Sequence, residues 1–241
     1  MTMDRRTLLK GASAVGAGAA GRTAATVEAS GVRPTASPYA VGMRYDATRC
    51  IGCRACVTAG KTANAMTGNL YDPPNELDGQ TKNIIKLYSE DGKRSYVKQQ
   101  CMHCIDPACV GACMIGALQK REYGIVTWDS DRCIGCRYCQ VACPYNVPKW
   151  DFEEAFGRIN KCQFCNHRLV EGKLPGCVEH CPTGASLFGT REQMLEEAHR
   201  RLAQEPGSTY QYARNTLDDP NRHEAIVPHY IDRVYGETQG G

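Results

Sequence analysis

The sequence contains few large apolar side chains and no long apolar run. Its 241 residues include only 4 Phe and 2 Trp, against 24 Gly and 12 Pro. Such a chain can build only a small conventional hydrophobic core. After Ser30 no stretch approaches the roughly 18 consecutive apolar residues that a membrane-spanning helix needs. We therefore expect no transmembrane helix in this chain.

Cysteine, in contrast, is abundant: there are 15, and they fall into four runs. The third run has the spacing C-x2-C-x2-C-x3-C-P, by which ferredoxins hold iron–sulfur clusters, with the fourth cysteine bound to the neighbouring cluster. The second and fourth runs have the same form with a longer third gap. The runs are Cys50/Cys53/Cys56, Cys101/Cys104/Cys109/Cys113, Cys133/Cys136/Cys139/Cys143-Pro144 and Cys162/Cys165/Cys177/Cys181-Pro182.

An internal repeat shows that the first run has lost its last cysteine. Residues 45–56 return 83 positions later as residues 128–139. Four residues after Cys139 comes Cys143, whereas four residues after Cys56 comes Gly60. A second repeat relates residues 109–113 to 177–181. Fifteen cysteines therefore stand where two copies of a two-run unit predict sixteen.

Zinc and disulfides are the alternatives to iron–sulfur clusters, and both fit less well. Zinc sites use pairs of C-x2-C rather than triplets that close on Cys-Pro. An odd number of cysteines in closely spaced runs suits disulfides badly. Because metal binding contributes to folding, clusters can also replace part of the missing core.

Bound clusters would also change the charge of the protein. A four-iron cluster with four thiolates carries about −2. Four clusters would take the formal charge from +3 to about −5. Nucleic acid is therefore not an expected partner.

Residues 1–29 are predicted to be a twin-arginine export signal. Arg5 and Arg6 precede a weakly apolar Gly/Ala stretch at 11–20. Cleavage after Ala19, Ala25 or Ala29 would each suit the sequence. Because this route exports folded proteins with their metal already inserted, it is compatible with thiolate ligands. The prediction places the protein on the periplasmic side of the cytoplasmic membrane.

Several motifs resemble a known family, the four-cluster electron-transfer subunits of periplasmic respiratory oxidoreductases. Three of them are QCMHCIDP at 100–107, CQVACPYNVPK at 139–149 and LPGCVE at 174–179. The segments FGTRE at 188–192, PGSTY at 206–210 and VYGE at 234–237 most resemble the ferredoxin-like subunits of hydrogenase-2, a membrane-bound NiFe hydrogenase. The resemblance runs from about Gly42 to the C-terminus.

The resemblance implies a nested pairing of the runs, first with fourth and second with third. Site I would then consist of Cys50, Cys53, Cys56 and Cys181; site II of Cys101, Cys104, Cys109 and Cys143; site III of Cys133, Cys136, Cys139 and Cys113. Site IV would have only Cys162, Cys165 and Cys177, because Gly60 stands where its fourth ligand belongs. We expect three 4Fe-4S clusters and a fourth that is 3Fe-4S or an incompletely ligated 4Fe-4S cluster. His103 and His180, beside the cysteines, are expected to form hydrogen bonds rather than to bind iron.

The expected fold is α+β: two tandem bacterial-ferredoxin-like modules of two clusters each, with short strands, loops and few helices. We expect a linker and entry strand at 30–49 and the four-cluster region at 50–189, with an insertion at 61–98. Residues 83–97 are predicted to be a hairpin that turns at Asp91-Gly92, and residues 124–128 a strand.

A C-terminal helix and an extended tail are expected at 190–241. The helix should span 190–203. Thr190 and Gln193 suit a capping box. The apolar face of the helix should consist of Met194, Leu195, Ala198 and Leu202.

The function that these predictions favour is a non-catalytic electron-transfer subunit. It would relay electrons between the small and large subunits of a periplasmic NiFe hydrogenase and an integral membrane quinone-reactive subunit. The first alternative keeps this role but replaces the hydrogenase by a molybdopterin-dependent respiratory oxidoreductase. The second is an enzyme that acts at the open iron of site IV, although no nucleophile–base or nucleotide motif accompanies the cysteines.

Overall fold

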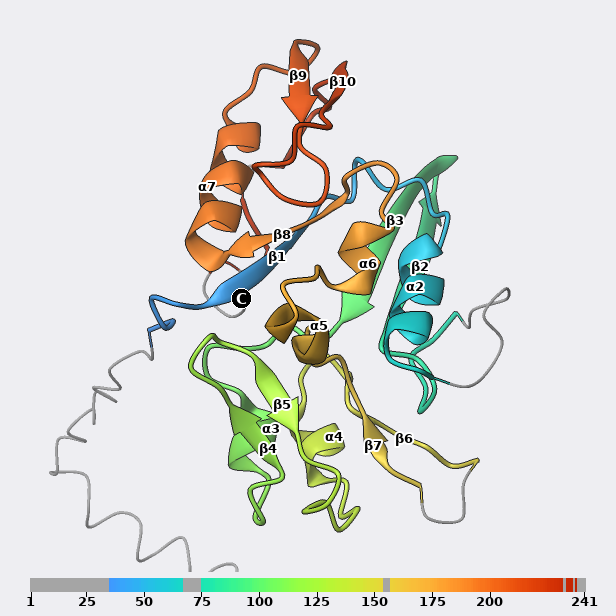
Figure 1. Cartoon of the computed structure of the whole chain (residues 1–241). Helices are drawn as coiled ribbons and strands as arrows, with labels where there is room; N and C mark the ends of the chain where they lie inside the picture. Colours follow the sequence, from blue (N-terminus) through green and yellow to red (C-terminus); the bar gives the residue numbers. More distant parts are fainter. Residues whose placement is uncertain (1–34, 67–74, 154–156, 232, 236, 238–241) are drawn as a thin grey trace, which may run out of the picture. The chain divides into compact units, whose positions relative to one another are not determined.

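The computed structural model describes residues 35–66, 75–153, 157–231, 233–235 and 237, so the predicted export signal and part of the predicted insertion lie outside it. The described part consists of short helices and strands joined by loops, as the α+β prediction requires (Figure 1). No helix in it is long and apolar enough to cross a membrane. The helices are α2 (Ala55–Ala63), α3 (Ala108–Gly111), α4 (Tyr138–Ala142), α5 (Asn166–Val170), α6 (Gly176–Glu179) and α7 (Arg191–Leu202).

The strands of the described part form five antiparallel pairs, β1·β8, β2·β3, β4·β5, β6·β7 and β9·β10. Their bounds are β1 (Val41–Tyr45), β2 (Asn83–Glu90), β3 (Lys93–Gln100), β4 (Leu118–Lys120), β5 (Val126–Trp128), β6 (Lys149–Trp150), β7 (Ile159–Asn160), β8 (Ser186–Thr190), β9 (Thr209–Tyr212) and β10 (His223–Ile226). The strand predicted at 124–128 is thus present as β5, shorter by two residues.

The pairs β4·β5 and β1·β8 are two copies of one arrangement. Leu118 pairs with Trp128, and the residues that repeat them in the sequence, Ser186 and Tyr45, pair with each other. The next two pairs keep the same register. Strand β1, which precedes the first cysteine run, therefore pairs with β8, which follows the fourth run. In the same way β4, which follows the second run, pairs with β5, which precedes the third.

The loops of the first and third runs also repeat. Gly52 and Gly135 both have φ +72°. Arg54 and Arg137 both adopt the left-handed region, with φ 57° and 64°, and each is followed directly by a helix, α2 or α4. The two loops, which lie 83 positions apart in the sequence, thus have similar backbone conformations as well as similar sequences.

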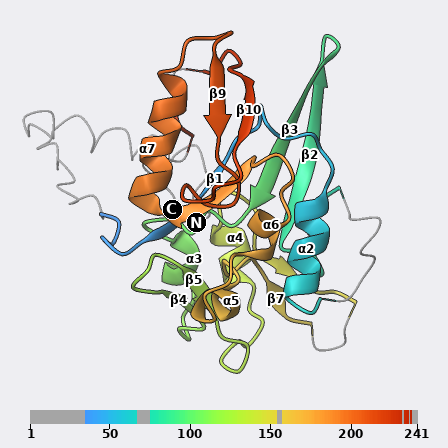
Figure 2. The same ribbon diagram turned by 45° about the horizontal axis from the view of Figure 1, so that its top comes forward.

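The predicted hairpin is present as β2·β3, which extends three residues beyond the prediction (Figure 2). Asp91 and Gly92 both have positive φ, 48° and 74°, as a two-residue hairpin turn requires. At the base of the hairpin Ile84 and Ile85 are buried and point to opposite faces of β2. Ile85 packs with Val57 of α2, whereas Ile84 joins a separate hydrophobic cluster.

The core of the described part is divided into small hydrophobic clusters rather than one large one. Three of the four contain or contact cysteines of the runs. The fourth lies under α7, where Met194 packs against Leu187 and Ala213. This division agrees with the small number of large apolar residues in the sequence.

The C-terminal helix is present as α7, with the predicted capping box at its start. Thr190 Oγ1 accepts the backbone N–H of Gln193 at 3.2 Å, and the Gln193 side chain accepts the N–H of Thr190 at 3.0 Å. Met194 and Ala198 are buried as predicted, whereas Leu195 and Leu202 are only partly buried. The buried face also carries two charged residues that the apolar pattern did not reveal, Glu197 and Arg201.

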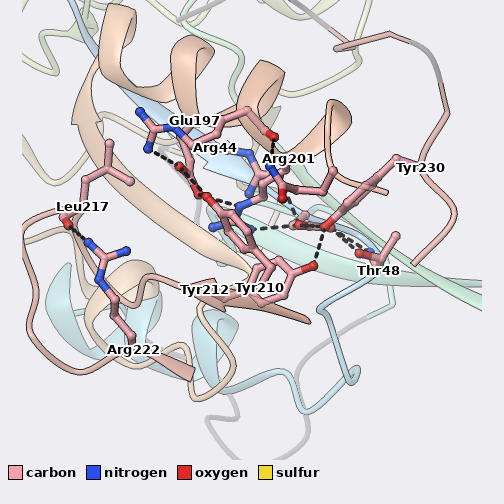
Figure 3. Close-up of polar contacts among 12 residues, drawn as sticks. Arg44, Thr48, Glu197, Arg201, Tyr210, Tyr212, Leu217, Arg222 and Tyr230 are labelled. Atoms are coloured by element: carbon pink, nitrogen blue, oxygen red, sulfur yellow. Dashed lines mark hydrogen bonds and ion pairs between the residues drawn. The ribbon is translucent and has the colours of Figure 1, made fainter. Parts of the chain in front are cut away.

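These two residues belong to a buried ion-pair network (Figure 3). Arg201 has no exposed surface and donates to Glu197 at 2.7 Å and to Asp46 at 3.0 Å. Asp46 also accepts from Arg44 and Tyr230, both at 3.1 Å. Burial alone would raise the pKa of Asp46, but the two guanidinium groups outweigh burial and lower it. The network joins the end of β1, α7 and the C-terminal tail.

Candidate iron–sulfur sites

All fifteen cysteines lie in the described residues, and each is a free thiol. Cys53 and Cys136, which are related by the repeat, are exposed, whereas the other thiols are buried or partly buried. Among the residues that the structure describes, no three His, Cys, Asp or Glu side chains lie close enough to hold a single metal ion.

The clearest of the predicted sites is site III, whose four thiols line one shared pocket. They are Cys113, Cys133, Cys136 and Cys139. The rest of the lining is formed by Gly135, Arg137 and the apolar residues Ile115, Ala117, Leu118, Trp128, Ile134 and Ile159. Carboxylates and imidazoles are absent from this described lining. Thiols alone in apolar surroundings suit an iron–sulfur cluster.

The thiols predicted for site II are also neighbours. Burial and the nearby thiols of Cys101, Cys143 and Cys104 together raise the pKa of Cys109 to about 11, because neighbouring thiolates repel one another. Cys101 and Cys143 both pack against the small hydrophobic cluster that contains Ile84. The structure thus brings together cysteines of the second and third runs, as the nested pairing requires.

At site I the structure brings the first run against the end of the fourth. Burial, with smaller contributions from Cys177, Cys181 and Cys50, raises the pKa of Cys56 to about 12. Cys50 and Cys56 also pack in one hydrophobic cluster, which includes Cys177. Cys53 is the exposed member of the predicted set.

Site IV lies beside Gly60. Burial raises the pKa of Cys162 to about 12, with further contributions from Cys177 and Cys165. Asn64 Nδ2 donates to the carbonyl of Gly60 at 2.7 Å and to Cys165 Sγ at 3.5 Å. The position at which the repeat predicts a cysteine is therefore linked through Asn64 to Cys165, one of the three thiols of this site.

Two lysines that the sequence patterns did not single out lie among these thiols. Lys161 is buried, donates to the carbonyl of Cys162 at 2.8 Å and lies 3.9 Å from Cys101 Sγ. Burial alone would lower the pKa of Lys98, but the thiolates of Cys177 and Cys56 outweigh the effect of burial, so the pKa is raised. Positive charge at these points would offset the negative charge of clusters. Lys161 directly precedes a cysteine, but nothing in the pattern indicated that its side chain turns inward.

The two histidines beside the cysteines form hydrogen bonds, as predicted. His103 is buried, and its Nδ1 accepts the backbone N–H of Val126 at 3.0 Å. Burial keeps the pKa of His103 well below its usual value, so the ring is neutral. His180 lies nearer the surface, with Nδ1 3.1 Å from the carbonyl oxygen of Gly176.

Comparison with known proteins agrees with this chemistry. Residues 93–191 match the family model of the 4Fe-4S dicluster domain. The fold and the cysteine sites thus define an iron–sulfur protein of the ferredoxin type.

Comparison with individual proteins shows to which family of iron–sulfur proteins the chain belongs. The chain is 43% identical to the hydrogenase-2 operon protein HybA of Escherichia coli O157:H7, over 99% of this chain and 78% of that protein. It is 36% identical to the iron–sulfur subunit of the nitrate-inducible formate dehydrogenase of Escherichia coli K12, over 80% of this chain and 69% of the relative. It is 35% identical to the formate dehydrogenase iron–sulfur subunit of Haemophilus influenzae, over 78% of this chain and 64% of the relative. The chain belongs to this family of iron–sulfur electron-transfer subunits, and the predicted family resemblance is confirmed.

Proposed function

We propose that this chain relays electrons between a periplasmic NiFe hydrogenase and an integral membrane quinone-reactive subunit. The observation that carries the proposal is that several sites of cysteine thiols lie next to one another within one chain. Such a series of sites suits electron transfer. No group of side chains suited to substrate binding accompanies them among the described residues. The similarity to a protein of the hydrogenase-2 operon supports a hydrogenase as the partner. Bound clusters would supply one-electron redox chemistry at each site.

The fifteen cysteines are proposed to hold iron in the four sets defined above, as three 4Fe-4S clusters and a fourth cluster without its fourth thiolate at site IV. The repeated strand pairs and loops support two ferredoxin-type modules, of which one contains sites II and III and the other sites I and IV. The twin-arginine motif in residues 1–29 supports export of the folded protein to the periplasm.

Neighbouring cysteines that belong to different sites support an order of electron transfer through the sites, I–IV–II–III. Three neighbouring pairs of cysteines link successive sites. These pairs are Cys56 with Cys177, Cys162 with Cys101, and Cys109 with Cys139. Lys161 lies at the middle link, between Cys162 and Cys101. Site IV, with its missing ligand, would therefore be an internal site of the relay.

The two outer sites are the places at which partners could exchange electrons. Cys53 of site I and Cys136 of site III are exposed. The apolar residues Ile51 and Ile134, which precede them by two positions, are also exposed, at 59% and 68%. Exposed apolar side chains beside a redox site suit contact with a partner protein. One end would face the hydrogenase and the other the membrane subunit.

A second candidate keeps the relay and exchanges the partner. Similarity to the iron–sulfur subunits of formate dehydrogenases favours a molybdopterin-dependent oxidoreductase as the catalytic partner.

Gentle purification of the tagged full chain from native membranes, with mass spectrometry of the co-purified proteins, tests the proposal. Recovery of NiFe large and small subunits with an integral membrane protein is the expected result. Recovery of a molybdopterin subunit would support the second candidate. Catalytic turnover of a small substrate by the purified chain alone would contradict both candidates.

A further inference from the structure

A side chain from another part of the sequence occupies the space of the missing cysteine. Gly60 is buried on α2, and a Cβ placed on it would lie only 2.6 Å from Asn83 Oδ1. Real Cβ atoms do not approach an oxygen so closely. The amide of Asn83, the first residue of β2, therefore stands where the side chain of a fourth ligand would begin.

Position 60 lies on a helix that packs against the segments carrying the thiols of site IV. The α2 helix packs directly on α6, because a Cβ on Gly176 would lie 2.8 Å from Ala63 Cβ and 2.9 Å from the carbonyl oxygen of Ala59. Gly176 directly precedes Cys177. On the other side, Asn64 bridges the carbonyl of Gly60 and Cys165 Sγ. The Asn83 amide thus lies against the one position of α2 at which the repeat predicts the fourth cysteine of site IV.

The amide also has hydrogen-bonding capacity left over. Asn83 is 4% exposed, and its Nδ2 has no hydrogen-bond partner among the described residues. A buried N–H group without an acceptor is energetically unfavourable. The sulfur atoms of a cluster at site IV would be anionic acceptors, and hydrogen bonds to cluster sulfur are one means by which proteins set reduction potentials. The unused donor therefore indicates an acceptor at this corner.

We propose that Asn83 closes the open corner of site IV. Its amide fills the volume left by Gly60 and donates to the cluster through Nδ2. Because a neutral amide cannot replace a thiolate, the site holds a three-iron cluster and does not take up a fourth iron. The inference rests on the cluster proposed for site IV and makes Asn83 a positioning residue of that site.

Iron uptake followed by EPR tests this role. Full-length protein, prepared anaerobically, is examined oxidised, then reduced with ferrous iron present and reoxidised. For the wild type we expect a three-iron signal that survives this treatment. In Asn83→Ala the corner is open, and the signal should be lost after treatment with iron. Asn64→Ala is the matched control, because it removes an amide that contacts the same site but does not fill position 60; its signal should survive.

Asn83→Asp gives an independent test if the alanine variant does not fold. The carboxylate has nearly the shape of the amide but replaces the Nδ2 donor by an anionic oxygen, which can bind iron. If Asn83 reaches the corner, the three-iron signal should be lost in the protein as purified, and total iron should rise.

The outcomes separate this inference from the proposed function. A wild type without iron–sulfur signals and without iron would overturn both. A wild type with only four-iron clusters would leave the relay intact but overturn the role of Asn83. The same conclusion would follow from a three-iron signal that responds to iron identically in wild type and Asn83→Ala, or from one that persists in Asn83→Asp.

Discussion

At the scale of single residues, Gly60 shows how one substitution can change a site without disturbing the fold around it. The α2 helix continues through Gly60 to Ala63, and Asn64 at its end contacts the Cys165 thiol of site IV. The helix needs no cysteine here, because its contact with α6 is made by Ala59 and Ala63. Only the ligand set is altered.

Gly60→Cys should supply the missing thiolate. The new side chain requires Asn83 to move, but the obstacle is the end of a flexible side chain, 2.6 Å from the new Cβ. We expect loss of the three-iron EPR signal and a gain of about one iron per chain. Gly92→Cys adds a thiol at the exposed hairpin turn and serves as the control, with signal and iron content unchanged. A three-iron signal that is equally strong in Gly60→Cys would contradict the assignment of site IV.

Arg201 illustrates a different effect, because its guanidinium forms ion pairs with two buried carboxylates, those of Asp46 and Glu197. Removal of its guanidinium in Arg201→Met leaves Glu197 and Asp46 buried with fewer partners. Breaking a buried pair in this way costs about 3–5 kcal/mol. The midpoint of thermal unfolding, compared at equal iron content, should therefore fall markedly.

The neighbouring Arg200 is the control for this prediction. Its side chain is 48% exposed and pairs with Glu196 at the surface, although it also reaches Glu197. Arg200→Met should cost no more than about 1 kcal/mol. Similar midpoints for the two variants would show that the buried network contributes little.

At the scale of elements, the two repeated loops depend on glycine for two reasons. Gly52 and Gly135 adopt positive φ, and each is covered by an aromatic ring. A Cβ on Gly52 would lie 2.3 Å from the ring of Tyr96, and one on Gly135 would lie 2.4 Å from the ring of Trp150. The loop that carries three cysteines thus packs against a strand outside its own run, β3 or β6.

Gly135→Ala should destabilise the loop more than its backbone angle alone predicts. Left-handed backbone costs an alanine roughly 1–2 kcal/mol at any position, and the contact with Trp150 adds to this cost. Gly92→Ala is the matched control, since its φ of +74° is almost the same and nothing lies within 4 Å of the new Cβ. We expect a lower unfolding midpoint and less bound iron for Gly135→Ala. Equal effects of the two changes would mean that the aromatic ring moves aside freely.

At the scale of the whole molecule, the pairing of β1 with β8 decides the arrangement of the sites. These strands flank the entire four-run region in the sequence, and their pairing brings Cys181 beside the first run. The inner pair β4·β5 brings the second and third runs together in the same way, and a short connection joins its two strands. Sites I and III consequently become the outer members of the proposed relay.

Ile134→Lys tests whether the exposed surface beside site III is used by a partner. The side chain is 68% exposed, so the change should leave the iron content unaltered. Electron transfer to or from the co-purified partner should slow by roughly tenfold, as expected when a central interface contact is lost. Ile226→Lys on β10, where the side chain is 69% exposed, is the control. Equal rates for both variants, measured in the native complex with an artificial electron acceptor, would place the contact elsewhere.

Local patterns predicted those elements whose signals lie close together in the chain. The hairpin at 83–97, the strand at 124–128 and the capping box of α7 are all present. The buried face of α7 was predicted only in part, because Glu197 and Arg201 are four residues apart, a spacing that is equally typical of an exposed ion pair. Their burial depends on Asp46, which is distant in sequence.

By itself the sequence determined the chemistry of this protein. Cysteine spacing is a local property, and the repeat predicts a missing ligand at Gly60. Only the tertiary structure decided what surrounds the thiols, namely Asn83 at the vacant corner and Lys161 between two sites. Asn83 lies 23 residues from Gly60 and Lys161 lies 60 residues from Cys101, and neither side chain follows a periodic pattern. Their positions arise from strand pairing and helix packing, which no local pattern encodes.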